Sequence, residues 1–272
     1  MARIIAIANQ KGGVGKTTTA VNLSAALALR GERCLVIDSD PQGNASSGLG
    51  IDKHELQGNL YDVYVGEASL GSVVVGTEID TLFIAPSNSD LVGAEVEIID
   101  KPGREVILKQ ALSSVSDEYD YIFIDCPPSL GLLTINALVA ADSVLVTLQC
   151  EYYALEGISS LMQTIELAQS QVNPELELEG VLLTMYDART NLAKQVENEA
   201  RKFFDKAVFH NVIPRNVRIS ESPSFGRPIV TYDPQSIGAG AYEALAKELQ
   251  RRRKKSDKKA EKKALKKLKA AG

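Results

Sequence analysis

The sequence is poor in the residues that form covalent or metal cross-links. Its three cysteines, Cys34, Cys126 and Cys150, follow no spacing typical of a disulfide framework, which points to a reducing cytoplasm. Its two histidines, His54 and His210, are widely separated, so no zinc site is expected. No uninterrupted apolar run approaches about 18 residues, and the N-terminus lacks the layout of a signal peptide. Stable membrane insertion is therefore not expected.

Charge is distributed unevenly along the chain. Residues 251–269 contain twelve lysines or arginines and only two acidic residues, Asp257 and Glu261, which gives a local charge of +10. The whole chain has 30 basic and 35 acidic residues, so residues 1–250 carry 18 basic and 33 acidic groups, or −15. We predict a packed domain over residues 1–250 and a basic tail over 251–272, either weakly amphipathic or disordered.

Short apolar runs alternate with segments of helical periodicity. Strands are predicted over 3–8, 34–37, 81–85, 121–124, 143–148, 179–185 and 208–213. Helices are predicted near 18–30, 104–116, 155–171, 192–204 and 239–250. Strands that alternate with helices of roughly 12 residues are typical of βαβ units. The sequence therefore predicts an α/β fold, with a doubly wound, mainly parallel, twisted sheet that helices cover on both faces.

A glycine-rich turn follows the first predicted strand and leads into a helix. Its residues are Lys11, Gly12, Gly13, Val14, Gly15, Lys16, Thr17 and Thr18. Glycines allow backbone N–H groups to surround phosphate oxygens, and the helix dipole adds to the attraction. In such a loop the lysine of Lys16-Thr17 reaches the β- and γ-phosphates, and the threonine hydroxyl binds Mg²⁺. This order of strand, loop and helix predicts the phosphate loop of a magnesium-dependent ATPase.

The loop departs from the common pattern G-x-x-x-x-G-K-[ST], because Gln10 stands at the usual first glycine and Lys11 follows it. In this form it resembles the deviant Walker A box of the ParA/MinD group of ATPases. The resemblance implies an ATP-dependent homodimer in which Lys11 reaches the nucleotide of the partner subunit. A solvated surface lysine is the alternative interpretation of Lys11.

Carboxylates follow two of the predicted strands. Asp38 and Asp40 come after the second strand, and Asp125 ends a buried-looking run with the form of a Walker B motif. Such carboxylates can hold metal-bound water and orient the water that attacks the γ-phosphate. By resemblance, Asp40 positions that water, and Asp38, Asp40 and Asp125 hold Mg²⁺ through bound water. The alternative for Asp38 and Asp40 is a simple turn before Pro41. The predicted catalytic residues are Lys11, Lys16 and Asp40.

The resemblance covers about residues 2–250 and is closest to ParA/Soj proteins, which partition chromosomes or plasmids. The segments that carry it begin at Asp38 (DSDPQGNASSGLG), Asp125 (DCPPSLG), Asp187 (DARTNL), Ile213 (IPRNVR) and Glu221 (ESPS). It implies slow hydrolysis of ATP by a sandwich dimer that binds double-stranded DNA without sequence specificity. A ParB-type partner would stimulate hydrolysis and release the dimer. Such a protein would be cytoplasmic and associated with the nucleoid.

The resemblance also assigns residues outside the phosphate loop. It implies that Pro214 and Asn216 lie near the adenine, and that Arg189 and Arg218 contribute to the DNA surface. Arginines can hold phosphates without reading sequence. A surface ion pair is the alternative interpretation of either arginine.

Other functions fit the sequence less well. A MinD-like membrane-cycling ATPase would end in an amphipathic helix with bulky apolar residues, whereas the tail after residue 255 has only Leu265 and Leu268. An iron–sulfur reductase would need two cysteines at a dimer axis, but Cys126 and Cys150 are better explained as buried structural thiols. A small-molecule kinase would need a substrate pocket that the sequence does not indicate. The basic tail could bind DNA or anionic lipid, or simply be solvated.

Overall fold

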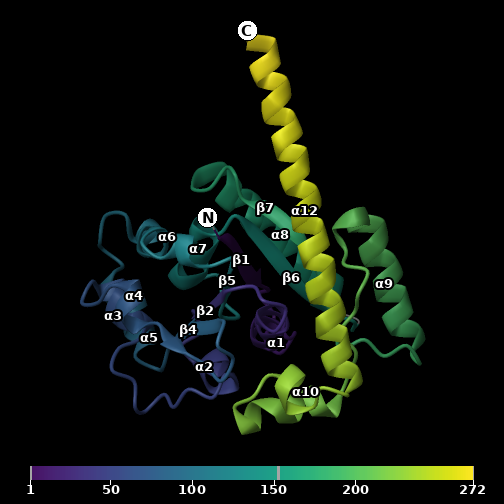
Figure 1. The fold of residues 1–272 in the computed structure, drawn as a ribbon, viewed down its shortest axis with the longest axis horizontal. Coiled ribbons are helices and arrows are strands. Elements are labelled where there is room, and N and C mark those ends of the chain that lie inside the picture. Colours follow the sequence, from purple (N-terminus) through teal and green to yellow (C-terminus); the bar gives the residue numbers. More distant parts are fainter. Residues whose placement is uncertain (1, 152–153, 272) are drawn as a thin grey trace.

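The computed structural model describes the backbone of residues 2–151 and 154–271, and their side chains outside 154–161, 164 and 259–271 (Figure 1). A seven-stranded sheet has the order β3-β4-β2-β5-β1-β6-β7. Its strands are β1 (Arg3–Ala8), β2 (Cys34–Asp38), β3 (Val75–Gly76), β4 (Leu82–Ala85), β5 (Tyr121–Asp125), β6 (Ser143–Gln149) and β7 (Glu177–Thr184). All neighbours pair in parallel except β3 and β4. The predicted α/β class with a mainly parallel sheet is confirmed.

Helices cover both faces of the sheet. They are α1 (Lys16–Ala28), α2 (Asn44–Gly48), α3 (Leu60–Val65), α4 (Leu70–Val73), α5 (Leu91–Glu97), α6 (Ile107–Ser113), α7 (Leu132–Ala140), α8 (Ala154–Gln171), α9 (Asn191–Phe204), α10 (Val217–Glu221), α11 (Ile229–Tyr232) and α12 (Ile237–Ala271). Short 3₁₀ turns cover Arg104–Val106, Ser116–Glu118, Asp205–Ala207 and Ser222–Phe225. The helix predicted near 104–116 corresponds to α6, whereas α2, α3, α4 and α5, together with α7, α10 and α11, were not predicted from the sequence.

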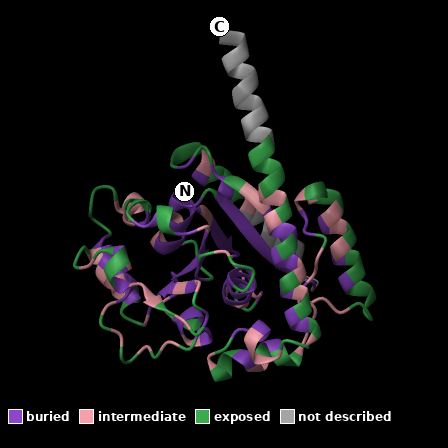
Figure 2. Cartoon of the chain, viewed as in Figure 1, coloured by how far each residue is buried: buried purple, intermediate pink, exposed green. Residues whose placement is uncertain are grey.

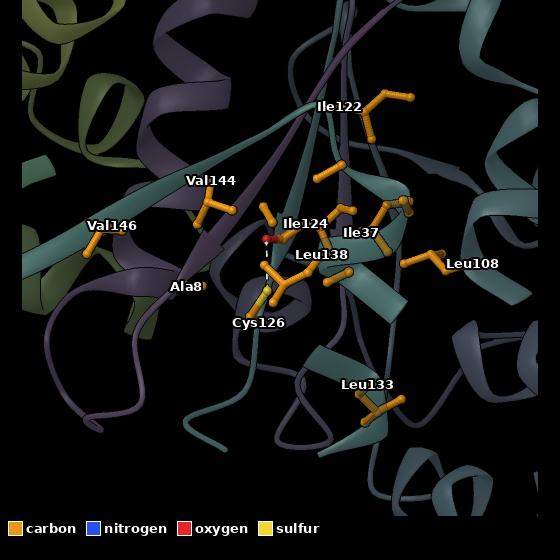
Figure 3. Packing of buried hydrophobic residues seen from close by; sticks show 14 of the residues in the cluster. Ala8, Ile37, Leu108, Ile122, Ile124, Cys126, Leu133, Leu138, Val144 and Val146 are labelled. Carbon is orange, nitrogen blue, oxygen red and sulfur yellow. Dashed lines mark hydrogen bonds between the residues drawn. The ribbon is translucent and has the colours of Figure 1, made fainter. Parts of the chain in front are cut away.

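The core consists of two apolar layers, one on each side of the sheet. Alternate residues of a strand enter different layers, so Ala6 packs with α7 residues on one side and Ile5 packs with α1 and α12 residues on the other. Because both faces are buried, the strands are almost continuously apolar, as their burial shows (Figure 2). Figure 3 shows the first layer, where the Cys126 thiol donates to the Ile124 carbonyl at 3.8 Å. Burial raises the pKa of the Cys126 thiol, which agrees with a structural role.

The strand predicted over residues 208–213 is wrong. This segment runs beside β7, and Phe209 and Ile213 donate to the carbonyls of Val181 and Leu183, but its bridge from Val208 to Val181 is isolated and no continuous strand forms. The backbone N–H groups of His210 and Asn211 instead donate to the carboxylate of Glu248 in α12, at 3.0 to 3.1 Å. Donors satisfied by a side chain cannot continue a ladder of strand hydrogen bonds.

Helix α12 extends well beyond the predicted helix over 239–250, and its C-terminal part projects from the body of the molecule (Figure 1). Two arginines fasten it where it leaves the core. Arg252 lies 4.0 Å from the centre of the Phe209 ring and donates to the carbonyls of Glu179, Ala207 and Val208. Arg253 donates to the Asp120 carbonyl and lies over the Tyr121 ring. Among the described residues, no helix has the length and apolarity needed to cross a bilayer.

We expect Arg252→Ala to lower the free energy of unfolding by about 2 kcal/mol, because it removes charge-assisted hydrogen bonds and an aromatic contact. Urea unfolding measured by circular dichroism would test this. Arg251→Ala is the matched control, since Arg251 is exposed and its only side-chain contact described is with the Lys247 carbonyl. Equal effects of the two substitutions would contradict the anchoring role of Arg252.

Candidate functional site

The phosphate loop connects the end of β1 to the first turn of α1. Gly13 and Gly15 have φ angles of 71° and 86°, which residues with a side chain adopt only with strain. The side chain of Asn9 joins the loop to the sheet, because its Nδ2 donates to the Thr147 carbonyl at 2.6 Å and its Oδ1 accepts from the Lys11 N–H at 2.9 Å. On the opposite side, the Thr184 hydroxyl donates to the Val14 carbonyl at 2.9 Å.

Asn9 and Thr184 were missed by the sequence analysis. Both act through contacts with residues more than a hundred positions away, Thr147 and Val14, so no local pattern identifies them. They fix the loop in a shape in which its backbone N–H groups can converge on an anion.

The start of α1 has the features of an anion site. No side chain caps the helix, and its first turn contains no acidic residue. The side chain of Lys16 enters the loop, where it is only 6% exposed and its Nζ donates to the Lys11 carbonyl at 3.1 Å. Burial lowers the pKa of Lys16, while the charges of Asp125 and Asp40 act in the opposite direction. Uncapped N–H groups beside a buried ammonium favour a bound phosphate.

Asp125 is a buried carboxylate without a hydrogen bond. It is fully buried, and neither of its oxygens has a partner that meets hydrogen-bond geometry. Parallel pairing of β2 with β5 places Asp38 directly beside it. Burial raises the pKa of Asp125 and the charge of Asp38 adds to the rise, whereas the Thr17 hydroxyl and Lys16 lower it. A carboxylate in such surroundings is costly unless a cation balances it.

Asp38 is satisfied from within the chain. Its Oδ2 accepts from the N–H and the hydroxyl of Ser46 in α2, at 2.8 and 2.7 Å, and its Oδ1 accepts from the Asp40 N–H at 3.4 Å. Burial raises the pKa of Asp38 to about 6, although the bonds from Ser46 lower it. Asp38, which is predicted to lie near the metal, therefore also has a structural role: its bonds with Ser46 hold α2 at the end of β2.

Asp40 lies in a loop that Ser87 holds in place. Its Oδ1 accepts from the Gln42 N–H at 3.0 Å, and its backbone carbonyl accepts from the Ser87 hydroxyl at 2.7 Å. The Ser87 N–H in turn donates to the Ser46 hydroxyl at 3.1 Å. These buried serines connect Asp38 and Asp40 to the segment that leads into α5, and the sequence analysis did not identify them.

These residues fit a hard divalent cation that takes part of its coordination from a nucleotide. Among the described residues, no group of three or more His, Cys, Asp or Glu could hold a metal by itself. Mg²⁺ is commonly held by one or two protein oxygens, with phosphates and water as its other ligands. Asp125, with both oxygens unsatisfied and Thr17 near it, provides such a partial site.

A cavity of about 320 Å³ lies beside the phosphate loop, and Gly15, Thr18, Thr184, Met185, Pro214 and Asn216 are among its lining residues. The Asn216 Oδ1 accepts from the N–H groups of Arg218 and Ile219 at the start of α10, so its amino group remains to donate to a ligand. Met185 has a φ of 49°, a strained conformation for a residue with a side chain. The structure therefore places Pro214 and Asn216 beside the phosphate loop, and their contact with the adenine stays a prediction.

The side chains of Lys11, Arg189 and Arg218, which are predicted to contact a partner subunit or DNA, all form ion pairs within the chain. The Lys11 Nζ lies 3.9 Å from the Glu151 carboxylate, which also pairs with Arg215 at 3.3 Å. Arg189 pairs with Asp187 at 2.7 Å but is 89% exposed, and Arg218 lies 3.0 Å from both Glu221 and Asp233. Neither Arg189 nor Arg218 lines the cavity. Ion pairs exposed to solvent contribute little to stability, so these arginines remain free to exchange partners.

The chain is similar to proteins of known family over most of its length. A family model described as an AAA domain matches residues 2–178. The sporulation initiation inhibitor protein Soj of Bacillus subtilis (strain 168) is 57% identical over 249 residues, which cover 92% of this chain and 98% of that protein. The chromosome partitioning protein ParA of Myxococcus xanthus (strain DK1622) is 55% identical over 250 residues, which cover 92% of this chain and 88% of that protein.

A solved structure has a similar fold. The cobyrinic acid a,c-diamide synthase of Mycobacterium smegmatis, with a bound ATP analog and magnesium, has a TM-score of 0.83 and 38% identity. The match covers 93% of this chain and 96% of that one.

We expect Asp125→Asn to raise the free energy of unfolding of the protein without nucleotide or metal, by on the order of 1 kcal/mol or more at pH 7. The pKa of Asp125 is higher in the folded than in the unfolded state, so the folded wild type binds more protons between the two values. As the pH falls through the raised folded-state pKa, the wild type therefore becomes more stable, and the stability advantage of Asp125→Asn should shrink toward the unfolded-state pKa of about 4.

Urea unfolding in EDTA at several pH values measures this difference, and Asp80→Asn at an exposed position is the control. The interpretation of Asp125 as a buried carboxylate without a compensating partner would be contradicted by either of two results. One is a difference in the free energy of unfolding between Asp125→Asn and the wild type that does not change with pH, and the other is a lower stability of Asp125→Asn.

Proposed function

Because the chain belongs to the ParA/Soj family of chromosome-partitioning P-loop ATPases, we propose that it is a DNA-partitioning ATPase that acts as an ATP-dependent dimer. Mg-ATP binding forms a sandwich dimer that binds double-stranded DNA without sequence specificity. Hydrolysis, slow alone and stimulated by a ParB-type partner, releases the DNA. The observation that carries the proposal is the unsatisfied Asp125 carboxylate, which lies with Lys16 at the uncapped start of α1.

In this proposal, different residues of the phosphate loop contact the phosphates and Mg²⁺. The backbone of Gly12, Gly13 and Gly15 surrounds the phosphates, and Lys16 leaves the Lys11 carbonyl to pair with the β- and γ-phosphate oxygens. The Thr17 hydroxyl and Asp125 would hold Mg²⁺, which neutralises charge that develops on the phosphates. In the adjoining cavity, Pro214 packs on the adenine and the Asn216 amino group donates to it.

Hydrolysis requires a water in line with the γ-phosphate. Asp40 is suited to orient that water, because Ser87 fixes its backbone and the carboxylate accepts only the Gln42 N–H among the bonds described. The main contribution of the protein to phosphoryl transfer is positioning and charge neutralisation, so one well-placed carboxylate is sufficient.

Lys11 would provide the contact between subunits. Its exposed side chain pairs loosely with Glu151 at 3.9 Å, so exchange of this partner for a phosphate of the second subunit's nucleotide costs little. An ammonium shared across the interface would make dimerisation depend on the nucleotide.

We expect Lys16→Ala to weaken ATP binding at least about tenfold, because it removes a charged contact with the phosphates. Lys11→Ala should keep nearly normal ATP binding by the monomer but lose the ATP-dependent dimer. Asp40→Ala is the control, since it should dimerise with ATP and release little phosphate. Nucleotide titration, analytical ultracentrifugation and phosphate-release assays separate these outcomes. A normal dimer of Lys11→Ala would disprove the cross-subunit contact.

Two arginines are proposed to bind DNA phosphates. Arg189→Ala and Arg218→Ala should each weaken binding equally on any DNA sequence, and should reduce the salt dependence of the binding constant by roughly one unit for each phosphate that the variant no longer binds. The ATP-dependent dimer should remain, since neither arginine lines the nucleotide cavity. Fluorescence anisotropy with random duplexes, with ATP, ADP or no nucleotide, is the measurement.

Deletion of residues 254–272 is the control for the basic tail. If the tail only adds electrostatic attraction, the deletion should lower affinity yet preserve the preference for ATP. Wild-type binding by both arginine variants, together with complete loss on deletion, would place the DNA site in the tail. Equal binding with ATP, ADP and no nucleotide would contradict the proposed cycle.

A further inference from the structure

Helix α5 is apolar on two opposite faces. Its inner residues Leu91, Ala94 and Ile98 are fully buried in the core. On its outer face, Val92 and Val96 are 57% and 71% exposed, and Ile99 just beyond the helix is 53% exposed. The spacing of these three residues, i, i+4 and i+7, gathers them into one stripe on the surface. The stripe takes no part in the nucleotide site, so its exposure needs another explanation.

Acidic residues accompany the stripe. Residues 88–105 contain five acidic residues, Asp90, Glu95, Glu97, Asp100 and Glu105, against the two bases Lys101 and Arg104. Both bases are engaged locally, because the Lys101 Nζ donates to the Val65 carbonyl and Arg104 pairs with Glu105 at 3.0 Å. The surface is complementary to a segment that combines apolar side chains with positive charge.

Hydrogen bonds connect the segment before α5 to the loop of Asp40, and connect α5 itself to α7, the helix that follows the loop of Asp125. At the N-terminal side, Ser87 donates to the Asp40 carbonyl at 2.7 Å and to the Ser46 hydroxyl at 3.1 Å. On the helix itself, Glu95 accepts from the Leu133 N–H of α7 at 3.3 Å, and α7 follows the loop after Asp125. A ligand that shifts α5 would therefore move groups bonded to the loops of Asp40 and Asp125.

From these observations we infer that the stripe Val92–Val96–Ile99 is the docking surface for the partner that stimulates hydrolysis, which presents a basic segment with apolar residues. This inference depends on the proposed function, because it assigns the place where stimulation begins. Apolar contact with Val92 and Val96 supplies the affinity, and the acidic border orients the basic segment and speeds its association. The bonds from Ser87 and Glu95 transmit docking to the water-positioning and metal-holding loops.

The test measures phosphate release with Mg-ATP and DNA while purified ParB-type partner of the same organism is titrated in. The double variant Val92→Ser/Val96→Ser should need about tenfold more partner for half-maximal stimulation and keep the basal rate, ATP-dependent dimer and DNA affinity of the wild type. Leu167→Ser, at an equally exposed position on α8, is the apolar control. Asp100→Lys should also weaken stimulation and reduce its salt dependence, whereas Asp80→Lys should not.

Each result decides between occupants. Unchanged stimulation of the double variant, with a stimulated wild type, would overturn the docking surface and leave the proposed function intact. Absence of stimulation in the wild type would instead contradict the proposed function. Loss of the ATP-dependent dimer in the double variant would assign the stripe to a second copy of the chain. Recovery of full stimulation on deletion of residues 254–272 from the double variant would assign it to the basic tail.

Discussion

Repulsion between two buried carboxylates at the ends of neighbouring strands is the constraint on which the site depends. Parallel pairing places Asp38 beside Asp125, and burial raises the pKa of both. The two differ in their partners, because Ser46 donates twice to Asp38, while Asp125 has Thr17 near it but no partner that meets hydrogen-bond geometry. The free energy that a cation would recover is therefore concentrated at Asp125. Binding of a metal nucleotide there would be coupled to the stability of the surrounding loops.

The hydrogen bonds that stabilise the Asp38 carboxylate also hold segments that are distant in sequence in fixed positions relative to one another. Ser46 bonds to Asp38, Ser87 bonds to Ser46, and the Ser87 hydroxyl bonds to the carbonyl of Asp40. All these groups are buried, so a break in the network would leave an unsatisfied polar atom without water to replace the partner. The loop of Asp40 therefore moves together with the segment that precedes α5. Movement of α5 by a bound partner would be a physically direct way to change the position of Asp40, the proposed catalytic carboxylate.

The sequence was most informative where function requires neighbouring residues, and least where it requires distant ones. Lys16 and Thr17 were predicted because a phosphate loop must join a strand to a helix start within a few residues. Asn9 and Ser87 were not, because each acts on a group that folding alone brings near. The predicted strand over 208–213 failed for the same reason, since the Glu248 carboxylate that takes its N–H donors lies in α12. Arg252, which anchors α12 where it leaves the core, contacts Phe209 and Ala207, and these partners are likewise distant in sequence.

The charge distribution gives a physical reason why the proposed DNA binding would depend on the proposed dimer. Residues 1–250 carry a net charge of −15, so the body repels DNA at long range. The two arginines proposed to bind phosphates are also paired with carboxylates, Arg189 with Asp187 and Arg218 with Glu221 and Asp233. Replacing each ion pair by a contact with a DNA phosphate yields only a small net gain in binding free energy, so one subunit should bind DNA weakly. In the proposed dimer, two subunits held together by nucleotide would present the same contacts at a high effective concentration, and avidity would then exceed the repulsion. Because each contact is weak by itself, separation of the subunits after hydrolysis would release the DNA.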